Sequence, residues 1–274
     1  MPRILDTINS PCDLKELSDE KLEVLAAEIR RELIDTISKT GGHLGPNLGV
    51  VELTLGIHKA LNCPEDVVAF DVGHQSYVHK LKTGRANDFS GVRCYQGPSG
   101  FPNRKESEFD LFGSGHASDS LSIALGYALA RDANGADGEV LALIGDGSLT
   151  GGMAWEALMH IGHTQTRMII VINDNEMSIT KNVGALSLYL GRIRLDKRYW
   201  GTRETVFSQV RKRGSIGEKL VDAGKTVRES FKQLVVPGML FEELGLRYMG
   251  PIDGHDIKQV SRAIELAKGA DGPV

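Results

Sequence analysis

Apolar residues recur at helical spacing from Leu22 to Ile37, directly after the polar stretch Ser18-Asp19-Glu20. A serine before the first turn and acidic residues within it are typical of a helix start, so we predict a helix that ends near Thr40. The same spacing predicts four further helices, at 49–61, 118–132, 152–162 and 257–268.

Short apolar runs alternate with these helices and predict buried strands within 67–75, where a glycine turn ends the strand, and at 140–145 and 168–173. The runs lack the in-out alternation of a half-solvated strand, which indicates an α/β fold with a mostly parallel sheet and helices on both faces. Ligands of such sheets bind at the carboxyl ends of the strands. We therefore expect three strand tails to share one edge: Asp71–His74, Gly145–Gly147 and Asn173–Asn175.

The segment Arg192–Lys232 has a different texture, with twelve basic and five acidic residues and little apolar periodicity. A nucleic-acid-binding arm is one interpretation, but no aromatic interleaving or binding motif accompanies the charge. We predict a solvated, flexible surface insertion.

Composition narrows the expected partners. The chain has 274 residues and a formal net charge of -4, which gives no electrostatic reason to expect nucleic acid or an acidic membrane as a partner. Its strongest apolar runs, such as MIIVI, are far shorter than the ~20 residues of a membrane span. Cys12, Cys63 and Cys94 form no C-x-x-C pair, so we interpret them as buried or incidental thiols in a reducing compartment. We expect a cytoplasmic protein whose partner is a small molecule.

The turn GDGSLTGG follows the predicted strand 140–145. It is compatible with a tight turn in which Asp146 caps the next helix. A dinucleotide-binding loop is disfavoured because its third glycine would fall on Thr150. Asn175 follows Asp146 by 29 positions and ends the next strand, so the two side chains can offer oxygen ligands to Mg²⁺. With a helix starting near Gly151, the pattern favours a metal-diphosphate site.

A G-D-G turn followed 25–30 residues later by asparagines resembles the transketolase-like thiamine-diphosphate enzymes, and implies their thiamine-diphosphate-binding fold. Longer stretches resemble the amino-terminal, diphosphate-binding part of the 1-deoxy-D-xylulose-5-phosphate synthase family. The resemblance covers nearly the whole chain and is weakest in the basic insertion. It rests on KTGGHLGPNLGVVELTLGIH, DVGHQSYVHKLKTGR, GFPNRKESEFD, GSGHASDS, NDNEMSITKNVGALS and LFEELGLRYMGPIDGHD.

The resemblance implies roles for particular residues. Mg²⁺ would be held by Asp146, the side chain of Asn175 and the backbone carbonyl of Met177. The thiamine diphosphate would contact the following residues: His74, Gly115, His116, Ala117, Gly147, Ser148 and Asn175. Ala117 departs from the family's Gly-His-Ser motif, which removes one hydroxyl but keeps the backbone donors.

Two histidines would be catalytic. His43 and His74 match family histidines that line the substrate channel near the thiazolium, where they would stabilise oxyanions or relay protons. A lone histidine is more often structural, but His43, His74 and His116 each follow a glycine, which favours a shared site.

The implied reaction condenses pyruvate with D-glyceraldehyde 3-phosphate to 1-deoxy-D-xylulose 5-phosphate and CO₂, a step toward isoprenoids, thiamine and pyridoxal. The family continues with two further domains and forms homodimers. We therefore expect 1–274 to be a single domain, obtained by truncation or proteolysis or as one subunit of a split enzyme, and inactive alone. Two alternatives are another transketolase-like transferase and a non-catalytic cofactor-binding subunit.

Overall fold

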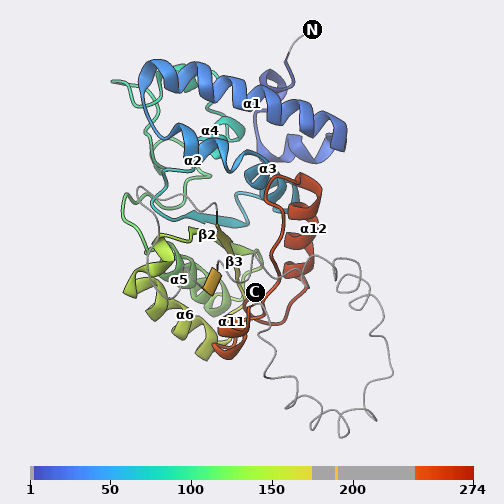
Figure 1. The fold of residues 1–274 in the computed structure, drawn as a ribbon, viewed down its shortest axis with the longest axis vertical. Helices are drawn as coiled ribbons and strands as arrows, with labels where there is room; N and C mark the ends of the chain where they lie inside the picture. The colour runs from blue at the N-terminus through green and yellow to red at the C-terminus, as the bar shows by residue number, and fades with distance from the viewer. Residues whose placement is uncertain (1–2, 175–188, 191–237) are drawn as a thin grey trace, which may run out of the picture.

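The computed structural model describes residues 3–174, 189–190 and 238–274 (Figure 1). Its sheet has three parallel strands in the order β1 (Val67–Phe70), β2 (Val140–Gly145) and β3 (Ile169–Asn173). Val67 pairs with Val140, and Gly145 pairs with Asn173. The predicted parallel sheet is thus confirmed.

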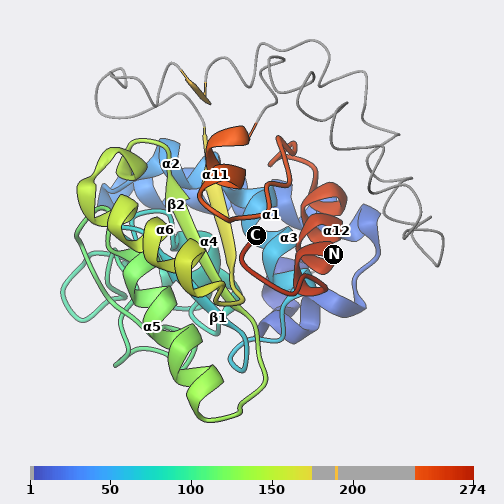
Figure 2. The same cartoon turned by 90° about the horizontal axis from the view of Figure 1, so that it is seen from below.

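Helices cover both faces of this sheet (Figures 1 and 2). Alternate residues of β2 serve the two layers: Val140, Ala142 and Ile144 pack with α5 (Ser120–Ala133) and α6 (Gly152–Thr164). Leu141 and Leu143 pack with α3 (Val51–Ala60) and α12 (Ile257–Lys268). A strand buried on both faces needs apolar residues at every position, which explains the continuous run VLALI.

An outer layer lies over α3. Helix α1 (Asp19–Thr40) begins as predicted, with the Ser18 side chain accepting a hydrogen bond from the Lys21 N–H. It packs on α3 and on α4 (Tyr77–Lys82). The remaining short elements are η1 (Leu5–Thr7), η2 (Pro11–Glu16), α2 (Leu44–Leu48), η3 (Phe89–Gly91), η4 (Ser148–Thr150) and α11 (Met239–Glu243).

The five predicted helices and three predicted strands are confirmed, with some differences at their ends. The first strand ends at Phe70 and the predicted glycine turn follows it, since Val72 and Gly73 have φ of 61° and 86°. The short helices α2 and α4 were not predicted, since neither is long enough to show a period.

Three other expectations concern the basic insertion, the cysteines and membrane-spanning segments. The predicted insertion Arg192–Lys232 lies outside the described residues. The three cysteines are free; Cys63 is buried, and Cys12 and Cys94 are exposed. Within the described ranges, no helix has the length and apolar character needed to cross a membrane.

Candidate cofactor site

The strand tails meet at one edge of the sheet. The backbone N–H of Asp71 donates to the carbonyl of Leu143 at 2.8 Å, and that of Asp146 donates to the carbonyl of Asn173 at 3.1 Å. The glycine-acid-glycine turn is therefore directly beside the start of Asn173-Asp174-Asn175. Asp146 is 9% exposed and lies at this edge.

A loop from another part of the chain reaches the same edge. The carboxylate of Asp71 accepts hydrogen bonds from the N–H groups of Ser118 and Ser120, at 3.0 and 3.2 Å. The Ser118 hydroxyl donates to the carbonyl of Ser148 at 2.6 Å. These contacts hold the Gly-His-Ala stretch, Gly115–Ala117, close to the turn that contains Gly147 and Ser148.

Asp146 is not a helix cap, although the sequence allowed that interpretation. The N-cap of η4 is Gly147 and that of α6 is Gly151, and neither helix has a side-chain cap. Gly151 is required for packing, because a Cβ there would overlap the Ser118 hydroxyl.

The edge fits a magnesium diphosphate. Around Gly115, Gly145 and Gly152, an added Cβ would meet no other described heavy atom within 4 Å, so a ligand can approach the backbone. The 13-residue helix α6 starts there, and a helix N-terminus favours an anion. The Asp146 carboxylate offers the oxygen that Mg²⁺ prefers.

The rest of the predicted ligand set is not described. Asn175 and Met177 lie outside the described residues. Within those residues, no group of three or more His, Cys, Asp and Glu side chains is arranged to hold a metal ion. The ligand set with Asn175 and Met177 stays a prediction, of which the structure places Asp146.

His43 and His74 lie together. Their ring centroids are 5.5 Å apart in an edge-on arrangement. Asn47 of α2 fixes both segments, because its side-chain NH₂ donates to the carbonyls of His43 and His74, each at 2.8 Å. Its side-chain oxygen accepts from the N–H of Tyr77 at 2.9 Å. Asn47 is not among the predicted site residues; its only signal in the sequence is a polar residue within the apolar stretch LGPNLGVV.

Both histidines favour the neutral form. Burial lowers the pKa of His43, and the nearby Arg93 lowers it further. Burial also lowers the pKa of His74, as does His43, whereas Asp71 opposes this shift. The Nδ1 atom of His74 is buried and has no hydrogen-bond partner among the described residues. Neutral imidazoles can give or take a proton, so the pair suits proton transfer near the strand edge.

A cavity of about 620 Å³ borders β3 and α12; its lining includes Ile172, Phe241 and Ile264, and it reaches the strand edge at Asn173 and Asp174. The histidine pair, Asp146 and Gly115–Ala117 do not line it. We therefore place the candidate site at the polar groups that converge on the strand edge, and not in this cavity.

The fold is that of the transketolase-like α/β class. The structure matches a transketolase from Campylobacter jejuni with a TM-score of 0.64 and 20% sequence identity, over 90% of this chain and 35% of the other. A transketolase from Leishmania mexicana matches with the same score and identity, over 94% of this chain and 35% of the other. This class has the thiamine-diphosphate-binding fold.

Sequence comparison identifies the family to which the chain belongs. The family model described as 1-deoxy-D-xylulose-5-phosphate synthase matches residues 5–274. The enzymes of that name from Heliobacterium modesticaldum and Natranaerobius thermophilus are each 54% identical to this chain over 274 residues. The chain belongs to the 1-deoxy-D-xylulose-5-phosphate synthase family. It spans 42% and 43% of these two relatives.

Proposed function

We propose that this chain supplies the magnesium-diphosphate half of a transferase that condenses pyruvate with D-glyceraldehyde 3-phosphate, giving 1-deoxy-D-xylulose 5-phosphate and CO₂. The cofactor of the proposed reaction is thiamine diphosphate. One observation carries the proposal: the hydrogen bond from the Asp146 N–H to the Asn173 carbonyl puts the G-D-G turn beside the start of the Asn-Asp-Asn stretch. Family membership supports the same reaction.

The chain's own residues would hold the cofactor at its diphosphate end. Asp146 would bind Mg²⁺ together with Asn175 and the carbonyl of Met177. Gly147, Ser148 and the stretch Gly115–Ala117 would contact the diphosphate, whose approach the open glycine backbone permits. The bound cofactor would supply the carbanion chemistry.

The histidine pair would serve the substrates. His43 and His74 are both disposed to be neutral, so each can donate a hydrogen bond to a carbonyl oxygen and accept a proton in return. The turn Asp71-Val72-Gly73 connects His74 to the edge that holds Asp146. The proposed chemistry therefore lies between the histidine pair and the strand ends, and the remaining groups of the site would come from a partner chain or further domains in a homodimer.

The test is calorimetric titration of thiamine diphosphate into the chain, with Mg²⁺ or with a chelator. We expect binding that requires Mg²⁺ and that Asp146→Ala weakens at least about tenfold, equivalent to ~1.4 kcal/mol. Asp137→Ala is the matched control, because Asp137 is an exposed acid on the loop before β2, at the other end of the strand. Equal affinity in parent and Asp146→Ala would remove the metal assignment, and absence of binding in the parent would refute the proposed function.

A further inference from the structure

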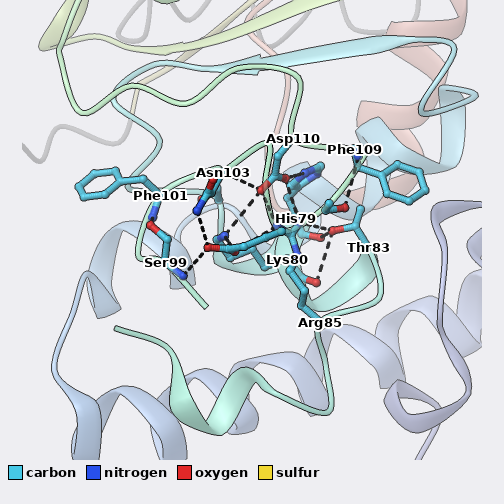
Figure 3. A network of polar contacts seen from close by, with 12 residues as sticks. His79, Lys80, Thr83, Arg85, Ser99, Phe101, Asn103, Phe109 and Asp110 are labelled. Atoms are coloured by element: carbon cyan, nitrogen blue, oxygen red, sulfur yellow. Dashed lines mark hydrogen bonds and ion pairs between the residues drawn. The ribbon is translucent and has the colours of Figure 1, made fainter. Parts of the chain in front are cut away.

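A second polar cluster surrounds α4 and takes no part in the proposed chemistry (Figure 3). We call it the α4 cluster; its members are His58, His79, Lys80, Arg85, Glu106 and Asp110. Lys80 is fully buried, and His79 and Asp110 are each 2% exposed. Burial of so many charged groups requires that they satisfy one another.

The charges of the α4 cluster balance. Lys80 donates to Glu106 at 2.7 Å. Arg85 makes a two-pronged contact with Asp110, through Nη1 to one carboxylate oxygen and through Nη2 to the other at 2.9 Å. Burial opposes ionisation of Asp110, but hydrogen bonds from His79 and Arg85 outweigh it and hold the Asp110 pKa well below its ordinary value. The cluster thus contains two cations and two carboxylates.

The hydrogen bonds also fix the histidine tautomers. Because the Asp110 carboxylate is an acceptor, Nε2 of His79 donates to it at 2.9 Å. Burial lowers the pKa of His79, so its Nδ1 is free to accept from Nε2 of His58 at 3.0 Å. The two rings are stacked with centroids 5.1 Å apart. His58 of α3, His79 and Asp110 thus form a hydrogen-bonded chain in which the tautomer of each histidine is fixed along these bonds.

The same two carboxylates hold a backbone segment. Asp110 accepts the N–H of Asn103 at 2.7 Å. Glu106 accepts the N–H of Ser99 at 2.8 Å and the side-chain amide of Asn103 at 3.1 Å. Segment 99–103 is therefore fastened to α4 at both of its ends.

Segment 99–103 packs against the histidine pair. The ring of Phe101 is 6.0 Å from that of His43, centroid to centroid. Pro102 covers Gly73, where a Cβ would overlap the proline ring, and Gly73 immediately precedes His74. Segment 99–103 thus shields His43 and covers the turn that leads to His74.

We propose that Asp110 and Glu106 are positioning residues, which fasten segment 99–103 to α4 and thereby set the position and hydration of His43. The importance of this coupling for turnover rests on the proposed function; the coupling itself does not, and it can be measured without cofactor.

The experiment is NMR titration of the full chain with labelled histidine rings, with His43 assigned by His43→Gln. Among the described residues, the titratable and charged groups that face His43 are His74, Tyr77 and Arg93, which remain in all variants. In Asp110→Asn and Glu106→Gln, segment 99–103 loosens and water reaches the imidazole. We expect the His43 pKa to rise toward its ordinary value of 6.5, as it should also in Phe101→Ala.

Asp66→Asn is the control for a purely structural loss. Asp66 is also buried and accepts two backbone N–H groups, from Asn62 and Glu139, but at the opposite end of β1. We expect it to lower stability and leave the His43 pKa at the parent value.

An unchanged His43 pKa in Glu106→Gln would overturn the proposal, as would a parental value in Phe101→Ala. Glu106→Gln decides even if Asp110→Asn does not fold, because the Glu106 side chain is 19% exposed and tolerates change better. A rise in Asp66→Asn as large as that in Glu106→Gln would also overturn it. Failure of thiamine diphosphate to bind the parent would refute the proposed function while leaving the histidine titration to be judged separately.

Discussion

The α4 cluster and the strand edge differ in how their polar groups are surrounded. In the α4 cluster, Asp110 accepts from His79, Arg85 and the backbone of Asn103, and its side chain is completely buried. At the strand edge, a Cβ added at Gly115, Gly145 or Gly152 would meet no heavy atom of the described residues within 4 Å. A satisfied network makes one geometry rigid, whereas open backbone and converging loops leave room for a ligand. The α4 cluster therefore supports the fold, and the strand edge is the candidate binding region.

Breaking the α4 cluster should have the largest effect. Asp110→Ala removes the two-pronged carboxylate partner of the buried Arg85, which keeps, among the described carboxylates, only the longer contact with Glu106 at 3.6 Å, so we expect a loss of about 3–5 kcal/mol in the free energy of unfolding. Urea denaturation at pH 7 measures it. Asp35→Ala removes an exposed acid of α1 and should change stability by less than about 0.5 kcal/mol. A loss in Asp110→Ala no greater than in Asp35→Ala would show that the cluster does not support the fold.

Lys82 sharpens this comparison, because its buried amine lacks, among the described residues, the carboxylate partner that Lys80 has in the α4 cluster. Lys82 is fully buried, and its amine has no hydrogen-bond partner within the described part of the chain. Burial lowers its pKa from 10.5 to about 7, against the opposing influence of Glu28 and Asp6. We expect Lys82→Met to increase stability by about 1–3 kcal/mol at pH 7.

The pH dependence of this gain has a definite sign. Between pH 7 and 10.5 the unfolded state binds more protons at Lys82 than the folded state, so stability of the parent rises with pH in this window. The advantage of Lys82→Met should therefore be greatest at pH 7 and below and disappear toward pH 10.5. Urea titrations at several pH values measure it, with the exposed Lys39→Met as control. A gain that is constant with pH would contradict this account.

The two regions also differ in how far sequence could predict them. Long helices and buried strands follow from periodicity, and the shared edge follows from the rule that parallel strands end on one side. The α4 cluster does not, because HKLKTGR reads as a solvated charged stretch, although Lys80 and Lys82 are fully buried. Their burial depends on tertiary partners: Asp110 lies 31 positions after His79 in the chain. Asn47 was missed for the same reason, since its partners His74 and Tyr77 lie 27 and 30 positions further along the chain.

The smallest effect on stability is expected at the strand edge itself. His116 is exposed, and its backbone N–H donates to the Ser114 hydroxyl at 2.9 Å, a bond that alanine retains. His116→Ala should thus alter the free energy of unfolding by less than about 0.5 kcal/mol. If the imidazole contacts the diphosphate as proposed, affinity for thiamine diphosphate with Mg²⁺ should fall by about three- to tenfold, the loss of one hydrogen bond of ~0.7–1.4 kcal/mol.

His163→Ala is the matched control for His116→Ala. His163 is also exposed, but it lies in the last turn of α6, at the far end of the helix from the strand edge. Calorimetry and urea denaturation of both variants should show lower affinity with unchanged stability only for His116→Ala. Equal affinity in the two variants would exclude the His116 ring from the binding site, and a large loss of stability in His116→Ala would show that this loop supports the fold, against the contrast drawn between the two regions.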